Sequence, residues 1–227
     1  MRHLTTIALL ASALVASAQN ENRGRSATLS LGGHYGEPLG EFEQVWESGF
    51  PGLGGQLSVP MRRLPFEWGL GFTWSYLGNK DFTVPIDVAS VPSKTGELDV
   101  NVNLYAVHPF LRFRPIQGRV MPYVDGLAGA RAFTIRTRLT ADGVDGPLSK
   151  KTEDVDIASS WGWAVGLMVA VTGNLYVEGR FEKLRGGEAT YVDRETIDVD
   201  ANGRLTYGTR TSTTDMWLAQ LGIALRF

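Results

Sequence analysis

The 227-residue sequence contains no cysteine, which excludes a disulfide framework and thiolate metal sites. It also lacks an excess of positive charge: 22 Lys and Arg face 24 Asp and Glu, a formal net charge of −2. A partner rich in phosphates, such as a nucleic acid, would require a basic surface, so we expect no nucleic-acid binding. After the first residues, no stretch approaches the roughly 18 apolar residues of a transmembrane helix. With 43% hydrophobic and 20% charged residues, the chain is nevertheless expected to fold.

The first 18 residues have the pattern of an export signal. Arg2 and His3 precede an apolar run from Ile7 to Val15, and Ala16-Ser17-Ala18 is the small-x-small pattern that signal peptidase accepts. The apolar run is too short to span a bilayer. We therefore predict a signal peptide at 1–18 and a single mature domain at 19–227, with a buried N-terminal helix as the alternative.

The rest of the chain alternates apolar with polar or small residues, which is the period of a strand with two unlike faces. Eight such segments lie at 27–35, 50–61, 66–76, 101–113, 120–133, 161–171, 175–182 and 217–227. Short turns at 62–65, 115–118 and 172–174 alternate with long polar loops near 36–49, 78–99, 138–156 and 186–212. Strict alternation predicts antiparallel neighbours, with both chain ends on the short-turn side.

A soluble sandwich also has two unlike faces, so alternation alone does not fix the fold. The polar positions, however, are often Gly, Ala or Ser, which weaken a solvent-facing strand but fit the narrow interior of an eight-stranded barrel. Aromatic residues gather at strand ends on the apolar side, as in the interfacial girdles of membrane barrels: Trp68, Trp74, Tyr76, Trp161, Trp163, Trp217 and Phe227. The prediction is an all-β fold, an eight-stranded antiparallel up-and-down transmembrane β-barrel.

The sequence resembles the small bacterial outer-membrane barrels of the OmpA/OmpX type. The most specific element is the C-terminal segment Leu221-Gly222-Ile223-Ala224-Leu225-Arg226-Phe227, which looks like the family's assembly signal. The segment from Met121 to Ala130 resembles a strand that is common in the family. The resemblance implies an integral outer-membrane protein that meets outer-membrane lipids, lipopolysaccharide and, through its last strand, the barrel-assembly machinery. Because 19–227 is accounted for by the barrel, we do not infer anchoring to the cell wall.

Charged residues of both signs fall on the face predicted to line the lumen. They are Glu67, His108, Arg112, Asp125, Arg131, Glu178, Arg180, Glu182 and Arg226. One interpretation is a polar pore or a charge gate. We favour a plug, because paired charges would fill a narrow lumen and an unpaired charge there is costly.

Catalysis is the third possibility, since some small outer-membrane barrels modify lipopolysaccharide acyl chains. Only His34 and His108 remain after signal removal, and no nearby carboxylate in the sequence orients His34. We therefore expect no enzyme activity and no cofactor.

A weak candidate for a metal site lies in the last long loop. Asp198, Asp200 and Asn202 precede Gly203 with the spacing of a calcium loop, but Thr209 replaces the bidentate Glu. An Asn-Gly hairpin is the alternative that we favour. The preferred function is a structural or interaction barrel whose long loops are free to bind an extracellular ligand, which the sequence does not identify.

Overall fold

The computed structural model describes residues 27–46, 48–62, 64–85, 95–141, 149–192, 198–199, 205–206 and 208–227. The predicted signal peptide at 1–18 lies outside this part of the chain. Among the residues described, no helix has the length and apolar character needed to cross a membrane.

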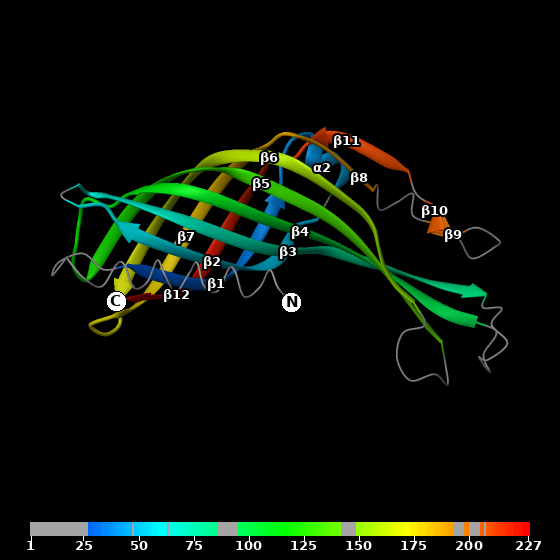
Figure 1. The fold of residues 1–227 in the computed structure, drawn as a ribbon, viewed down its shortest axis with the longest axis horizontal. Helices are drawn as coiled ribbons and strands as arrows, with labels where there is room; N and C mark the ends of the chain where they lie inside the picture. Colours follow the sequence, from blue (N-terminus) through cyan, green and yellow to red (C-terminus); the bar gives the residue numbers. More distant parts are fainter. Residues whose placement is uncertain are drawn as a thin grey trace.

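The chain forms one closed antiparallel barrel (Figure 1). Its strands are β1 (Thr28–Pro38), β2 (Phe50–Pro60), β3 (Phe66–Pro85), β4 (Thr95–Phe113), β5 (Val120–Ala141), β6 (Ser149–Ala170), β7 (Leu175–Gly186) and β12 (Met216–Arg226). Each strand pairs with its neighbours in the chain, and β1 closes the ring on β12 through a register that begins at Thr28 and Arg226. The predicted eight-stranded up-and-down β-barrel is therefore confirmed.

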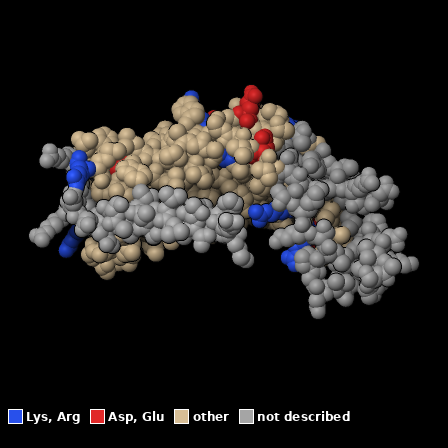
Figure 2. Space-filling view, viewed as in Figure 1, with Lys and Arg blue, Asp and Glu red and all other residues tan. Residues whose placement is uncertain are grey.

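The outer wall of the barrel is apolar and unprotected. Along β12 the side chains of Leu221, Ile223 and Leu225 are exposed, and Leu221 keeps 69% of its surface accessible, whereas Ala224 is fully buried inside. The same alternation runs along the other barrel strands, and in Figure 2 the wall is largely free of Lys, Arg, Asp and Glu. A water-soluble protein rarely exposes so continuous an apolar surface. The wall therefore has the character of a surface in contact with membrane hydrocarbon.

The aromatic residues predicted for the membrane interfaces lie on this outer wall, exposed or half-buried. Trp163 and Trp217 pack on either side of Phe181. Their ring centroids lie 6.1 and 5.8 Å, respectively, from the centroid of the Phe181 ring. This cluster lies near the long-loop rim of the barrel, where β12 begins at Met216.

The strands are longer at the long-loop end than the sequence indicated. Parts of the predicted loops at 78–99 and 138–156 are strand, because β3 and β4 stay paired as far as Pro85 and Thr95, and β5 and β6 as far as Leu139 and Ser149. The predicted strands ended where apolar residues no longer alternate on the outer face. Beyond the membrane, however, the backbone ladder continues while the outward side chains of β4 and β5 become polar, as at Asp99, Arg136 and Arg138. The four strands β3–β6 consequently project well past the barrel (Figure 1).

The other two predicted long loops also contain regular structure. The loop at 186–212 holds β8 (Glu188–Val192) paired with β11 (Thr209–Thr213), and β9 (Asp198–Val199) paired with β10 (Leu205–Thr206). The loop at 36–49 contains a short helix, α2 (Glu41–Val45).

Helix α2 closes the long-loop mouth of the barrel with apolar side chains. Phe42 is fully buried and meets Phe133 of β5 edge-on, with ring centroids 5.9 Å apart. The helix is held in place by Glu41, whose carboxylate accepts hydrogen bonds from the backbone N–H and hydroxyl of Thr213, both at 3.1 Å. We call the buried group at this mouth the apolar cap; its members are Phe42, Trp46, Phe50, Leu77, Val102 and Phe133.

We expect Phe42→Ala to detach α2 from the mouth while the barrel itself stays folded. Removing a buried Phe ring typically costs about 3–5 kcal/mol, which exceeds what a five-residue helix contributes by itself. The measurement is protease cleavage within 36–49 in protein reconstituted into liposomes, with heat-modifiable gel mobility as the test of folding. Glu43→Ala is the control, because Glu43 lies on the same helix but is exposed. Equal cleavage of both variants would contradict a packing role for Phe42.

Candidate functional site

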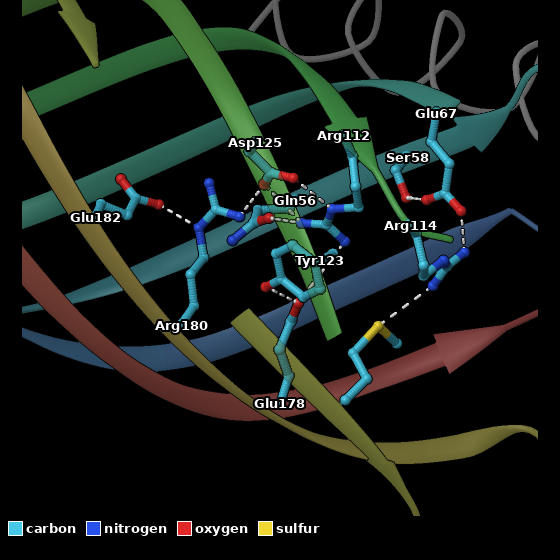
Figure 3. Close-up of polar contacts among 11 residues, drawn as sticks. Gln56, Ser58, Glu67, Arg112, Arg114, Tyr123, Asp125, Glu178, Arg180 and Glu182 are labelled. Carbon is cyan, nitrogen blue, oxygen red and sulfur yellow. Dashed lines mark hydrogen bonds and ion pairs between the residues drawn. The ribbon is translucent and has the colours of Figure 1, made fainter. Parts of the chain in front are cut away.

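The middle of the lumen is crossed by a connected network of charged side chains (Figure 3). Arg112 of β4 binds Asp125 of β5 in a two-pronged pair, with Nε and Nη2 at 2.9 and 3.0 Å from the two carboxylate oxygens. Arg180 of β7 donates to the same Asp125 and also to Glu182. Asp125 therefore joins two guanidinium groups that enter from different walls of the barrel.

Two polar side chains complete this central network. The Arg112 guanidinium also donates to the side-chain oxygen of Gln56 on β2 at 2.9 Å. Its Nη1 lies 3.8 Å from Glu178 of β7, and the Tyr123 hydroxyl donates to the same carboxylate. The network thus links β2, β4, β5 and β7 across the lumen (Figure 3).

A second ion pair lies toward the short-turn end. Glu67 of β3 accepts hydrogen bonds from Arg114, directly after β4, and from the Ser58 hydroxyl at 2.9 Å. Arg114 also contacts the sulfur of Met168 at 3.4 Å. Arg114 and Glu67 are both almost completely buried, so this pair closes the lumen below the central network.

Glycines on the lumen wall make room for inward aromatic rings. A Cβ at Gly166 would lie 2.1 Å from the Tyr123 ring, and one at Gly69 would lie 2.3 Å from the Phe110 ring. The Tyr123 ring in turn stacks under Arg112, whose guanidinium carbon is 3.7 Å from the ring centroid. At Gly69 and Gly166, neighbouring aromatic rings therefore fill the space that a side chain would occupy.

Two histidine–serine pairs lie between the network and the apolar cap. His34 Nε2 is 2.8 Å from Ser75 Oγ, and His108 Nε2 is 2.8 Å from Ser160 Oγ. His34 Nδ1 has no hydrogen-bond partner among the described residues. A Ser–His pair works as a nucleophile and base when a third group orients the imidazole, and His34 lacks such a group here.

The structure brings together most, but not all, of the charged residues that the sequence placed in the lumen. Arg112, Asp125, Glu178, Arg180 and Glu182 form the central network, while Glu67 pairs separately with Arg114. The remaining three lie apart from these ion pairs: His108, Arg131 and Arg226.

Arg131 and Arg226 were expected among the carboxylates, and the structure differs on both. Arg131 is buried and donates to the backbone carbonyl of Thr214 rather than to a carboxylate. Arg226 reaches Gln117 at 3.1 Å, at the short-turn mouth, because it is the last residue of β12.

Sequence reasoning missed several members of the lumen. Arg114 lies two residues after Arg112, so extending the same period by one step would have found it. Gln56 and Tyr123 also occupy inward positions of strands that were correctly placed. Phe50, Val102 and Phe133 of the apolar cap lie in predicted strands. The contact of these strands with Phe42 of α2 joins distant segments, so no local pattern indicated it.

One carboxyl group outside the membrane-spanning part has a shifted pKa. Asp99 of β4 lies opposite Asp81 of β3 in the projecting sheet. A hydrogen bond from this neighbouring carboxyl, assisted by partial burial, raises the pKa of Asp99, while Arg138 acts in the opposite direction. Asp99 therefore binds a proton at a higher pH than an isolated aspartate does.

The calcium candidate is only partly covered by the structure. Asp200 and Asn202 lie outside the described residues, and Asp198 belongs to β9, which pairs with β10 as the hairpin alternative requires. Within the described ranges, no group of His, Asp and Glu side chains is arranged to hold a metal ion.

Comparison with known proteins gave matches in structure but not in sequence. No family model matches the chain. No curated protein sequence matches it either.

Similar solved structures include small outer-membrane barrels. Ail, the attachment invasion locus protein of Yersinia pestis, crystallised with the heparin analogue sucrose octasulfate, is 13% identical with a TM-score of 0.46, covering 90% of this chain and 99% of that one. Neisserial surface protein A has 13% identity and a TM-score of 0.44, covering 88% and 97%. The N-terminal β-barrel domain of Pseudomonas aeruginosa OprF has 15% identity and a TM-score of 0.36, covering 90% and 100%. Similarity at this level says nothing about activity.

We expect Arg180→Ala to destabilise the barrel strongly, because it leaves Asp125 and Glu182 each without one cationic partner. Breaking a buried ion pair in this way typically costs about 3–5 kcal/mol. The measurement is the free energy of unfolding in urea, in detergent micelles. Arg119→Ala is the matched control, since Arg119 is exposed in the turn before β5. If both variants lose the same free energy, the central network does not stabilise the barrel.

Proposed function

We propose that this protein is an integral outer-membrane barrel that displays a projecting β-sheet outside the cell for binding, without an open pore and without catalysis. The observation that carries the proposal is the contrast between the two parts of the molecule. Side chains cross the lumen at three levels, namely the apolar cap, the central network and the Glu67–Arg114 pair. Strands β3–β6, in contrast, continue far beyond the barrel (Figure 1).

The apolar outer wall supports the membrane location. In hydrocarbon every backbone N–H and C=O must find a partner within the protein, and a closed ring of strands meets this requirement. The apolar wall would then lie in contact with outer-membrane lipids. We further propose that strand β12, which ends beside Phe227, is the segment that the barrel-assembly machinery recognises.

The filled lumen supports a role other than solute transport. The apolar cap occupies the long-loop mouth, the central network crosses the middle, and Glu67 with Arg114 lies below. An eight-stranded barrel has room for little more than its own side chains. A small-solute or ion pore therefore remains the less supported alternative.

The projecting sheet supports a binding role. β2 stops pairing with β3 at Gly52 and Ser75, and β7 stops pairing with β6 at Gly186 and Ser160, whereas the ladders from β3 to β6 continue. Beyond the rim, β3–β6 therefore form a four-stranded sheet of their own. A surface held out on a rigid scaffold is where binding functions commonly reside.

The histidine arrangement supports the absence of catalysis. Both Ser–His pairs are buried in the lumen, beneath the apolar cap. The apolar cap lies between them and a lipid or peptide substrate outside the barrel. A lipid-modifying enzyme would instead need its nucleophile on a surface that the acyl chain reaches.

The first test is electrical. Purified protein in planar lipid bilayers is expected to give no stable channels, because paired side chains and the apolar cap interrupt any continuous water column. Frequent, uniform openings of porin size would contradict the proposal and favour the pore. A double variant, Arg112→Ala with Arg180→Ala, is the positive control: it is expected to conduct more than wild type, in material that heat-modifiable mobility shows to be folded.

The second test asks whether the outer end of the projecting sheet is dispensable for folding of the barrel. We expect that replacing residues 82–98 and 139–149 each by Asn-Gly, which makes a tight hairpin turn, leaves the barrel folded. The remaining pairs Asp81–Asp99 and Arg138–Lys150 would flank the new turns. The measurement is heat-modifiable mobility and the unfolding temperature in detergent. A variant that no longer folds would show that these strands serve barrel assembly rather than display.

A further inference from the structure

The outer wall carries a notch at the depth of the membrane. It has a volume of about 440 Å³ and is formed by β1–β4. Gly55 of β2 lies at its base, between Leu31 of β1 and Phe72 of β3, which are its direct partners in the ladder. Since glycine has no side chain, the wall is recessed at this point. The rim is completed by Leu53, Trp74 and Tyr105.

The rim of the notch is ordered on its long-loop side. The Trp74 indole N–H donates to the side-chain oxygen of Asn103 at 2.9 Å. The Tyr105 ring packs near Phe72, with centroids 6.4 Å apart. These contacts hold two large rings as a fixed edge, so the notch is a built feature and does not depend on one flexible side chain.

A cation lies directly beyond this edge. The guanidinium carbon of Arg136 on β5 is 5.8 Å from the centroid of the Tyr105 ring. Arg136 is exposed and forms no ion pair within the described part of the chain. Its register partner on β4 is the neutral Asn101, whereas the next outward arginine, Arg138, is opposite Asp99.

We propose that this notch and Arg136 form a binding site for a phosphate-bearing lipid of the outer leaflet, namely lipopolysaccharide. One acyl chain lies over Gly55 between Leu31 and Phe72, and a phosphate of the headgroup meets the Arg136 guanidinium. The inference rests on the outer-membrane location proposed above. Lipopolysaccharide is chosen over phospholipid because Arg136 lies toward the projecting sheet, on the side that faces outward.

Charge and shape contribute differently to such a site. An acyl chain that leaves the bilayer for the notch gains little hydrophobic free energy, because lipid tails are as apolar as the notch itself. A charge-assisted hydrogen bond to phosphate is the stronger contact. Arg136 is therefore expected to set the affinity, and the notch to fix where the lipid lies.

The test is lipid binding by the mature, detergent-solubilised barrel, followed by native mass spectrometry with bisphosphorylated lipid A as the probe. Wild-type protein is expected to retain one lipid A in a saturable manner. Arg136→Gln is expected to weaken binding roughly tenfold or more, as for loss of one hydrogen bond to a charged group. Two further lipids serve as negative probes, dephosphorylated lipid A and phosphatidylethanolamine. We expect each of them to bind wild type no more tightly than lipid A binds Arg136→Gln.

The notch is tested separately by Gly55→Leu. The new Cβ would approach a flexible methyl group of Leu31 at 3.0 Å, so the barrel accommodates it while the side chain fills the recess. We expect a smaller loss than for Arg136→Gln. Two controls match these changes: Arg138→Gln removes an outward arginine opposite Asp99, and Gly126→Leu fills open space on the wall at β5.

Equal binding by Arg136→Gln and Arg138→Gln, or no saturable lipid A on the wild type, would overturn the inference. Heat-modifiable mobility confirms that each variant is folded, and Arg136→Lys, which keeps the charge, should bind better than Arg136→Gln. A folded, non-conducting barrel without a retained lipid would refute this site alone. Channel formation would refute the proposed function and leave the lipid result standing.

Discussion

The structure depends on the requirement that no backbone hydrogen-bonding group be left unpaired in the membrane. The pairing of β1 with β12 meets it, because these two strands would otherwise be the open edges of the sheet. Closure with this number of strands fixes the width of the lumen, and a narrow lumen dictates which side chains fit inside. Much of the sequence pattern, including the small residues on the inward face, follows from that one constraint.

Within the lumen, charge pairing and packing act together. Arg112 is at once an ion partner of Asp125, a hydrogen-bond donor to Gln56 and a flat group stacked on Tyr123. Gly166 is needed beside the Tyr123 ring, since a Cβ there would collide with it. Buried ion pairs are often no more stabilising than an apolar filling of the same volume, but each member is costly to remove singly.

The two ends of the barrel differ, and this difference gives the molecule its direction. At the short-turn end the strands stop at the membrane and connect by tight turns. At the other end β3–β6 continue as a sheet, and α2 folds over the mouth with Phe42 inward. The arrangement separates the filled barrel in the membrane from the exposed projecting sheet. Arg136 lies at the boundary between the barrel and the sheet.

How much of this the sequence determined varies along each strand. Where a strand lies in the bilayer, apolar and inward residues alternate without interruption, so the eight barrel strands, their antiparallel order and inward residues such as Asp125 and Arg180 could be read directly from the chain. The same period would have reached Arg114, two residues beyond Arg112. Beyond the bilayer the outward residues of β4 become polar, such as Asp99, while Val100 and Val102 stay buried on the inner face. The alternation therefore continues with another composition, and backbone pairing shows how far the strands extend.

The choice of partners inside the lumen was decided by the tertiary structure. Glu67 pairs with Arg114, Arg131 meets a backbone carbonyl, and Arg226 faces the short-turn mouth. Sequence period assigns a residue to a face, but the height at which two strands meet depends on register and on the tilt of the closed barrel. The apolar cap depends likewise on contacts between α2 and β5, which are far apart in the sequence, so no local pattern encodes it.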